Sequence, residues 1–363
     1  MVNMLASLYE ILPSRVIFGV GCLAKLPEEI DRLGASRVLV LSTPRQRETG
    51  LEIAKRLGAR AAGLFDRAAM HIPIEIAQEA REKARRMSAD CFVAVGGGST
   101  MGLAKAIVLP DAASAPLPIL ALPTSYAGSE MTPLWSLLQD GRETTGSDAR
   151  VLPKTVLYDP VLTLGIPVDF SAVSGINAIA NCIEALYAKD VKPVISTAAE
   201  EGIRALSASL PVVVKQPGNI EVRSQALYGA WLGGVALGSA GMALHYKLCH
   251  SLGGAFNLPH AEIHAVILPH SVAYNAPAAA EAIERVAGAL GIDSAAETAA
   301  AALYDLAVRL GAPVSLAAIG MRAADLDRAA DLAAENAYDN PRPVVREGIR
   351  ALLQDAFDGK KPE

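Results

Sequence analysis

The run at residues 93–107 (VAVGGGSTMGLAKAI) constrains the fold of this chain more than any other segment. An apolar segment with strand character leads through Gly96, Gly97 and Gly98 into a helical pattern that carries Ser99 in its first turn. The first N–H groups of such a helix attract anions, and glycines let a phosphate approach the backbone closely. The run therefore predicts a phosphate-binding turn, with a tight structural turn as the alternative. It lacks the spacing of the common G-x-G-x-x-G fingerprint.

Short β-branched runs alternate with helical patterns over the first 160 residues, which is typical of a parallel sheet with crossover helices. The expected strands are 37–42, 91–95, 117–122 and 151–158, and the expected helices are 51–57 and 73–87. From Ser174 onward the chain is alanine-rich and helical, with almost no strand signal. We therefore expect an α/β domain at 1–160, followed by an all-α domain at 161–363.

A second polar loop, at residues 122–133 (LPTSYAGSEMTP), follows another expected strand. It carries four hydroxyl side chains: Thr124, Ser125, Ser129 and Thr132. So many hydroxyl groups after a buried strand suit hydrogen bonding to a nucleotide, although a polar turn would explain them equally well.

Charge and composition exclude several classes of protein. The formal net charge of −5 provides no basic field for nucleic acid or for an anionic membrane. With 52% hydrophobic residues, the chain is neither disordered nor a disulfide scaffold. Four widely spaced cysteines favour reduced thiols in a cytoplasmic protein, and the N-terminus lacks the pattern of a signal peptide. Residues 226–244 are interrupted by glycines and are expected to form a buried helix or helix pair.

Two features of the helical half indicate a site. Asn177, Asn181 and Glu184 fall at i, i+4 and i+7, so they form one polar stripe on an otherwise apolar helix. Five of the six histidines lie between residues 241 and 270: His245, His250, His260, His264 and His270. One buried histidine usually has a structural role, but such a concentration favours a binding or catalytic site.

Six segments resemble the iron-containing alcohol dehydrogenase family, and within it the maleylacetate reductase subfamily. They are GGGSTMGLAK, LPTSYAGSEMTPLW, VLPKTVLYDP, ALYGAWLGG, HYKLCHSLGGAFNLPHAE and NPRP, in the same order. The resemblance implies a dinucleotide-binding first domain, a helical second domain with the substrate site, a cleft between them and a homodimer. It also implies a reaction, the NADH- or NADPH-dependent reduction of maleylacetate to 3-oxoadipate. This reaction would place the protein in the catabolism of aromatic compounds.

The wider family binds a divalent metal through one aspartate and three histidines. The resemblance places these ligands on Asn177, Asn181, Tyr246 and His260. A carboxamide is a poor ligand for zinc or iron(II), and a tyrosine would first have to lose its proton. We therefore expect no tightly bound catalytic metal.

Two further positions depart from the family pattern. The lysine that reaches the cofactor ribose corresponds to Glu143, whose carboxylate would repel a pyrophosphate. The acidic residue that follows the first strand corresponds to Thr43, which leaves the choice between NADH and NADPH open.

The resemblance and the motifs together assign the site residues. The expected cofactor-binding residues are Gly96, Gly97, Gly98, Ser99, Thr124, Ser125, Ser129 and Thr132. The expected catalytic residues are His245, Tyr246 and Lys247, and the expected substrate-binding residues are Asn177, Asn181, His250 and Arg342. Lys247 and His245 are the candidates for stabilising an enolate oxygen, and the phenol of Tyr246 can only donate a hydrogen bond. We expect His245 to titrate near neutrality and to deliver the proton. The substrate is expected to be a small anion.

Two functions fit these residues. The first is metal-independent reduction of a conjugated keto acid, which the intact glycine and hydroxyl loops favour. The second is a non-redox cyclisation, isomerisation or condensation in a biosynthetic pathway, which the altered metal positions and Glu143 favour. Cofactor binding distinguishes them, because only the reductase requires a nicotinamide.

Overall fold

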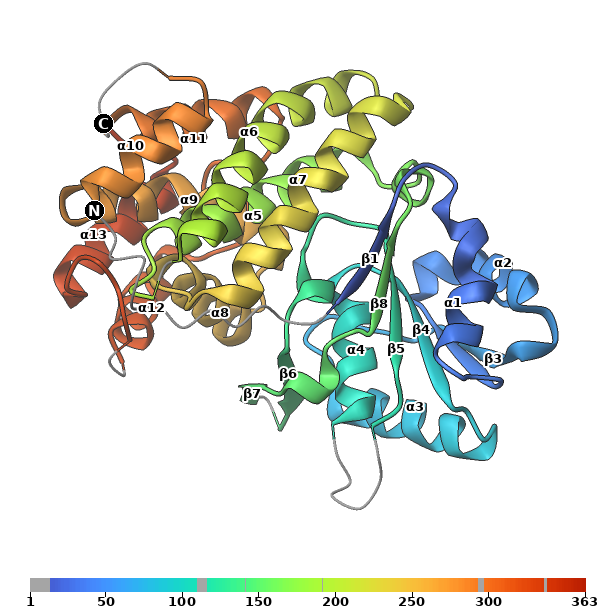
Figure 1. Cartoon of the computed structure of the whole chain (residues 1–363). Helices are drawn as coiled ribbons and strands as arrows, with labels where there is room; N and C mark the ends of the chain where they lie inside the picture. Colours follow the sequence, from blue (N-terminus) through green and yellow to red (C-terminus); the bar gives the residue numbers. More distant parts are fainter. Residues whose placement is uncertain (1–13, 110–115, 141, 191, 293–296, 336–337) are drawn as a thin grey trace. The chain divides into compact units, whose positions relative to one another are not determined.

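A computed structural model describes residues 14–109, 116–140, 142–190, 192–292, 297–335 and 338–363 (Figure 1). The chain divides into two compact units, one that ends at Ile166 and one that begins at Pro167. The first contains a parallel sheet with helices, and the described part of the second contains helices and no strand.

The sheet of the first unit has six parallel strands in the order β1-β8-β5-β4-β2-β3 (Figure 1). Their bounds are Arg15–Phe18 for β1, Val38–Leu41 for β2, Ala61–Phe65 for β3, Cys91–Gly96 for β4, Ile119–Pro123 for β5 and Thr155–Tyr158 for β8. Every residue of β2, β4, β5 and β8 is buried, as expected for inner strands covered by crossover helices. The prediction of a parallel sheet is confirmed.

Four α-helices and a hairpin complete this unit. The helices are α1 Leu26–Arg32, α2 Arg47–Leu57, α3 Ile74–Arg86 and α4 Gly98–Val108. The antiparallel hairpin consists of β6 Leu134–Gln139 and β7 Arg142–Ser147. Helix α4 is buried from its third residue onward, which explains why its sequence is apolar on all sides.

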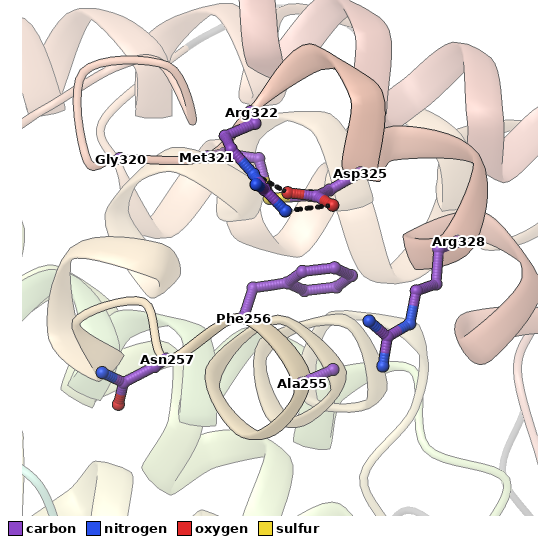
Figure 2. Close-up of a pocket in the computed structure, with 8 residues that line it drawn as sticks. All are labelled: Ala255, Phe256, Asn257, Gly320, Met321, Arg322, Asp325 and Arg328. Carbon is purple, nitrogen blue, oxygen red and sulfur yellow. Dashed lines mark hydrogen bonds and ion pairs between the residues drawn. The ribbon is translucent and has the colours of Figure 1, made fainter.

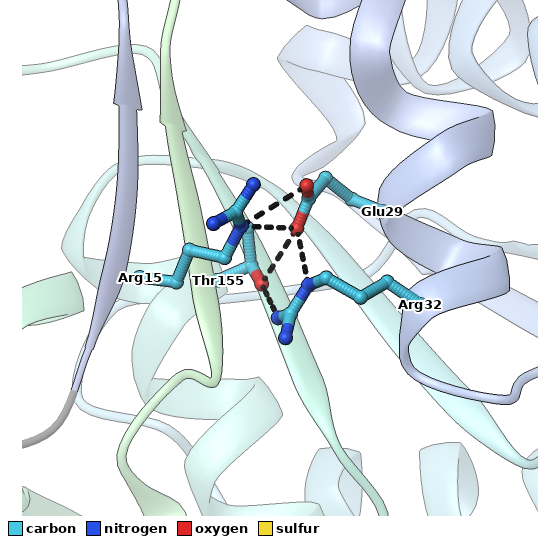
Figure 3. Close-up of polar contacts among 4 residues, drawn as sticks. All are labelled: Arg15, Glu29, Arg32 and Thr155. Carbon is cyan, nitrogen blue, oxygen red and sulfur yellow. Dashed lines mark hydrogen bonds and ion pairs between the residues drawn. The ribbon is translucent and has the colours of Figure 1, made fainter.

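An ion-pair cluster around the buried Glu29 joins the amino ends of β1 and β8, with the two arginine side chains partly exposed (Figure 3). The carboxylate of Glu29 accepts hydrogen bonds from Nε of Arg15 at 3.0 Å and from Nε of Arg32 at 2.9 Å. Arg32 also donates to Oγ1 of Thr155 at 2.9 Å. Burial opposes the charge of Glu29, but the two guanidinium groups outweigh it and hold the pKa of the carboxyl below its ordinary value. Because ligands bind parallel sheets at the opposite, carboxyl ends, this cluster serves stability.

Nine α-helices form the described part of the second unit. They are α5 Val168–Leu186, α6 Pro193–Lys215, α7 Ile220–Ser239, α8 Leu244–Phe256, α9 His260–Asn275, α10 Ala280–Ala289, α11 Glu297–Arg309, α12 Leu326–Ala334 and α13 Arg346–Asp358. Helix α5 is buried throughout residues 171–186. Glycine allows its close contact with α7, since a Cβ on Gly233 would lie 2.8 Å from the carbonyl oxygen of Ala178. Apolar side chains of α8, α9, α12 and α13 form a separate core cluster.

The glycine-rich segment at residues 226–244 contains the end of α7 and the break before α8, so the expected helix pair is present. Among the described residues, no single helix is both long and apolar enough to cross a membrane. Helices α7 and α8 meet that criterion only when taken together, and the chain bends by 95° between them.

Candidate functional site

Three loops of the first unit meet at the carboxyl ends of β2, β4 and β5. Gly96 at the end of β4 lies opposite Pro123 of β5, and the next residue, Thr124, donates its N–H to the carbonyl of Gly96 at 3.1 Å. The side chain of Gln46, which follows β2, donates to Oγ1 of Thr124. Strand order reverses here, because the chain leaves β2 towards β3 on one side and returns through β4 on the other. Ligands of open parallel sheets bind at such switch points.

The three consecutive glycines have different roles. A Cβ on Gly96 would lie 2.2 Å from Oγ1 of Thr100, and one on Gly97 would lie 2.5 Å from Oγ of Ser125, so both glycines permit close packing. A Cβ on Gly98 would meet no atom within 4 Å. Gly98 is the first residue of α4, where backbone N–H groups favour an anion. The space beside it is open, and contacts of Gly96, Gly97 and Gly98 with a cofactor pyrophosphate stay predictions.

Buried Lys105 ties down the second polar loop. Its ammonium donates to the carbonyl of Ser129 at 2.7 Å, to Oγ1 of Thr132 at 2.9 Å and to the carbonyl of Leu134 at 2.8 Å. Burial lowers the pKa of Lys105 to about 7, and the charge of Glu130 opposes that shift. Ser129 and Thr132 thus help to hold the loop, and cofactor contacts of all four hydroxyl residues stay predictions, as do those of Ser99.

The two residues of this unit that depart from the family pattern, Thr43 and Glu143, are both among the residues that the structure describes. Thr43 is the second residue after β2 and directly precedes the short turn Pro44–Gln46. Glu143 lies on β7, where it pairs with Leu138 of the hairpin.

In the helical unit, Glu184 of α5 holds the start of α8. Its side chain is fully buried and accepts the N–H groups of Ala243 at 2.6 Å, His245 at 3.1 Å and Tyr246 at 3.4 Å. The hydroxyl of Tyr187 donates to the same carboxylate at 2.7 Å. Burial raises the pKa of Glu184, and these hydrogen bonds oppose the rise. Because Glu184 satisfies these donors, the first turn of α8 is fixed in place rather than open to an anionic ligand.

The structure brings the residues at the former metal positions close together. The hydroxyl of Tyr246 donates to Oδ1 of Asn181 at 2.5 Å, and its ring centroid lies 5.2 Å from that of His264. His260 contacts the ring of His264, and the Nε2 atoms of the two histidines are 3.3 Å apart. Asn177 is buried on α5, and no described residue bonds its Oδ1.

These side chains do not fit the divalent metal that the family implies. The oxygen of Asn181 already accepts the phenol of Tyr246, and burial raises the pKa of that phenol well above its ordinary value. The phenol is therefore neutral at physiological pH. Only His260 keeps the ligand type of the family, and structural or catalytic zinc sites use three or four protein ligands.

Another group of possible metal ligands lies deeper, at His245, Cys249 and His264, with ligand atoms within 4.8 Å of one another. Nε2 of His245 and Nδ1 of His264 are 2.8 Å apart, whereas two tetrahedral zinc ligands at ~2.05 Å would be about 3.3 Å apart. The three side chains are thus arranged to bond one another.

Predicted residue His245 is fully buried at the centre of this cluster. Its Nδ1 lies 3.2 Å from Oγ of Ser271, and its Nε2 contacts His264. The expectation that His245 titrates near neutrality is wrong, because burial lowers its pKa to about 3. His245 is therefore neutral at physiological pH, and its role as the direct proton donor stays a prediction.

The remaining predicted residues surround this cluster or lie near the start of α8. His250 is exposed, with its ring centroid 5.8 Å from that of Tyr246. The ammonium of Lys247 lies 5.8 Å from the ring centroid of Tyr338. Arg342 donates to the carbonyl of Tyr274 at 3.1 Å and stacks on that ring. Binding of a substrate carboxylate by His250 or Arg342 stays a prediction.

His270, the last of the five clustered histidines in the sequence, lies apart from the others and lines a surface hollow with Asp355 and Lys360.

Several residues that organise the site were not predicted: Lys105, Cys249, Ser271 and the capping role of Glu184. Lys105, Glu184 and Ser271 bond residues distant in sequence, whereas Cys249 bonds His245 one helical turn away. Only the apolar surroundings of Lys105 and Glu184 hint at a special role.

A surface hollow of about 320 Å³ lies at the opposite end of α8 (Figure 2). Its lining includes Phe256, Arg328 and the ion pair in which Arg322 donates to Asp325 at 2.6 Å. Phe256 lies eleven positions after His245 on the same helix, roughly 16 Å away at 1.5 Å per residue. No residue predicted to act on substrate lines this hollow.

A parallel-sheet domain with a glycine turn at its switch point, together with a helical domain that contains a histidine cluster, defines a dehydrogenase-like class of two-domain enzymes. Family models agree: "Iron-containing alcohol dehydrogenase" matches residues 13–160, and "Fe-containing alcohol dehydrogenase family, C-terminal" matches residues 171–357. The chain belongs to the iron-containing alcohol dehydrogenase family.

Similar proteins cover nearly the whole chain. A maleylacetate reductase from Burkholderia cepacia is 55% identical over 357 residues, which are 98% of this chain and 99% of that protein. A maleylacetate reductase from Sphingobium indicum is 51% identical and covers 98% of both chains. The crystal structure of maleylacetate reductase from Rhizobium sp. strain MTP-10005 superposes with a TM-score of 0.92 at 49% identity, covering 99% of this chain and 100% of that chain.

Proposed function

We propose that this protein reduces the carbon–carbon double bond of maleylacetate, or of a closely related conjugated keto acid, with NADH or NADPH. The observation that carries the proposal is the 55% identity, over 98% of this chain, to a protein named maleylacetate reductase. The open space beside Gly98, at the start of α4, supports nucleotide binding. We also propose that the enzyme works as a homodimer and without a catalytic metal.

The bound nicotinamide supplies a hydride. In the first unit, Gly98 and the neighbouring hydroxyl groups of Thr124 and Ser125 are the proposed contacts of the pyrophosphate. Thr43 lies two residues after β2, in the region where an acidic residue of dinucleotide-binding folds usually binds the ribose. Without a carboxylate at that position, we expect both NADH and NADPH to be accepted.

In the second unit, the proposed role of the side chains is to stabilise and protonate an enolate. Hydride addition to the carbon β to the ketone moves negative charge to the keto oxygen. Lys247 is the proposed donor to that oxygen, and Tyr246, which keeps its proton, can join it only by giving up its hydrogen bond to Asn181. The histidine cluster is the proposed source of the proton that the α carbon receives, and His250 and Arg342 are the proposed partners of substrate carboxylates.

The test is a titration of the purified protein with NADH and with NADPH, followed by nicotinamide absorbance in the presence of maleylacetate. We expect oxidation of the nicotinamide with formation of 3-oxoadipate in equal amount. If neither nucleotide binds, or if maleylacetate leaves the absorbance unchanged, the reductase proposal is wrong. Consumption of a keto acid without nicotinamide oxidation would favour the non-redox alternative.

Metal content provides a separate prediction. We expect elemental analysis of the active protein to find far less than one zinc or iron per chain, because the former ligand positions hold a phenol–carboxamide pair. Incubation with a chelator should leave kcat unchanged. About one metal per chain, with activity lost to the chelator and restored by the metal, would contradict metal independence.

Substitution Gly98→Val should raise the Kd for NADH by at least about 10-fold, which corresponds to ~1.4 kcal/mol of binding free energy. The new methyl groups would occupy the space proposed for the pyrophosphate, and because a Cβ at this position meets no neighbouring atom within 4 Å, the fold should persist. Gly165→Val is the matched control, because Gly165 is an exposed turn residue of the same unit with equally open surroundings. Equal Kd values for the two folded variants would show that the glycine turn is only structural.

A further inference from the structure

We infer that Ser271 is a positioning residue that fixes the tautomer of His245, and that it thereby sets the direction of a chain of hydrogen-bonded histidines. The chain runs from the half-buried His260 through His264 to the fully buried His245. The direction of these hydrogen bonds follows from the distances between the side chains, whereas the transfer of a proton to substrate rests on the proposed reductase function.

The inner end of the chain fixes one proton. Oγ of Ser271 lies 3.0 Å from the carbonyl oxygen of Leu268 and 3.2 Å from Nδ1 of His245. A carbonyl oxygen can only accept, so the single hydroxyl proton of Ser271 is donated to Leu268. The bond to His245 then requires a proton on Nδ1 of that histidine. In a neutral imidazole this leaves Nε2 as an acceptor.

The same logic passes outward along the chain. Nε2 of His245 lies 2.8 Å from Nδ1 of His264, so His264 donates from Nδ1 and keeps a lone pair on Nε2. That nitrogen lies 3.3 Å from Nε2 of His260, which therefore donates in turn. Each ring carries its proton on the nitrogen that faces the protein interior.

Two other observations agree with this direction. Sγ of Cys249 lies 3.6 Å from Nε2 of His245, so the weakly donating thiol also faces that nitrogen, whose one lone pair the shorter bond from His264 occupies. Burial also lowers the pKa values of His245 and His264, so both rings are neutral and carry one proton each. If the rings are neutral and the carbonyl of Leu268 accepts the proton of Ser271, only one placement of the ring protons gives each contact from Ser271 to His260 a donor and an acceptor.

The direction of the chain identifies the member that exchanges protons with substrate. All N–H groups of His245 and His264 are used within the chain, and His260 is its outermost, half-buried member, so we assign the proton exchange with substrate to His260. With its proton on Nε2 held by His264, His260 binds a further proton at Nδ1 and transfers it to the α carbon of the enolate. The Nδ1–H bond breaks, a C–H bond forms with the enolate electron pair, and His260 returns to its original tautomer. Solvent supplies the next proton.

The first test is NMR of protein labelled with ¹⁵N-histidine, in which the two ring nitrogens of each tautomer have distinct shifts. We expect His245 to carry its proton on Nδ1 in the parent, to lose that preference in Ser271→Ala, and to regain it in Ser271→Thr. Single His→Gln variants assign the signals. A parent with the proton on Nε2 of His245, or a Ser271→Ala variant with the parental tautomer, would overturn the inference.

The second test measures kcat and the Kd for NADH. We expect Ser271→Ala to lower kcat by roughly 10-fold, well below the ~10⁴-fold loss seen when a catalytic histidine is held in the wrong tautomer. The Kd should stay parental, and Ser271→Thr should restore kcat. Ser209→Ala is the matched control, because buried Ser209 makes the same type of bond to the carbonyl of Leu206 on α6. An equal loss in both variants would show a structural effect and overturn the positioning role.

The two proposals fail separately. If the parent shows the expected tautomer but does not oxidise NADH with maleylacetate, the proposed function is wrong and the direction of the chain is retained. If the parent turns over maleylacetate while His245 has the opposite tautomer, the function is retained and the inference is wrong.

Discussion

Replacement of His260 by alanine is expected to lower kcat by roughly 10²–10⁴-fold, the usual contribution of a general acid or base. His260 is the half-buried outer member of the histidine chain, and it donates towards His264 at 3.3 Å. Without its imidazole, the enolate would take its proton from water. The Kd for NADH should stay near the parental value, because the proposed cofactor contacts lie in the other unit.

A parallel His245→Ala variant decides which histidine delivers the proton. If His245 donates directly, its removal should cost the larger factor and His260→Ala should change kcat little. If His260 donates, His245→Ala should cost less, because it disturbs the chain only through His264. The exposed His250 is the control for a general effect of losing an imidazole, since His250→Ala should raise KM for an anionic substrate and leave kcat largely unchanged. Parental kcat in both His245→Ala and His260→Ala would remove the histidine chain from the mechanism.

The sheet could be predicted where the sequence has strong local patterns, and less well elsewhere. Strands β2, β4, β5 and β8 are buried on both faces, and their apolar runs made all four recognisable. Strand β1 has only four residues, RVIF, and β3 reads AAGLF with no β-branched side chain. Both lie at the edges of the sheet, where pairing with β8 and β2 compensates for weak local preference.

The site could be predicted only one helix at a time. Helical periodicity placed Asn181 and Glu184 on one polar stripe of α5, and the structure has both of them facing α8. Their partners could not be predicted, because no local signal connects Glu184 with N–H groups about sixty residues later in the chain. Ser271 is a similar case, since one hydroxyl on α9 has no sequence signature that relates it to His245.

Replacement of Glu184 by alanine is expected to lower the free energy of unfolding by about 3–5 kcal/mol, since three buried N–H groups at roughly 1–3 kcal/mol each would lose their acceptor. Alanine also removes the cost of burying a carboxylate, so the expected loss of unfolding free energy is smaller than the largest total for three unsatisfied N–H groups. Urea denaturation measures the difference. Glu281→Ala is the control, because Glu281 is an exposed acid in the first turn of α10 and should change stability by less than about 0.5 kcal/mol.

The same substitution should also lower kcat in the molecules that remain folded. Glu184 accepts the backbone N–H groups of His245 and Tyr246, so its loss lets the first turn of α8 fray and moves both side chains away from their partners on α5 and α9. Glu184→Gln keeps one accepting oxygen but turns an NH₂ group towards backbone donors, so we expect an intermediate loss of stability. Parental stability and kcat in Glu184→Ala would mean that packing alone holds the start of α8. A graded loss from glutamine to alanine would show that the carboxylate fixes the helix that carries His245 and Tyr246.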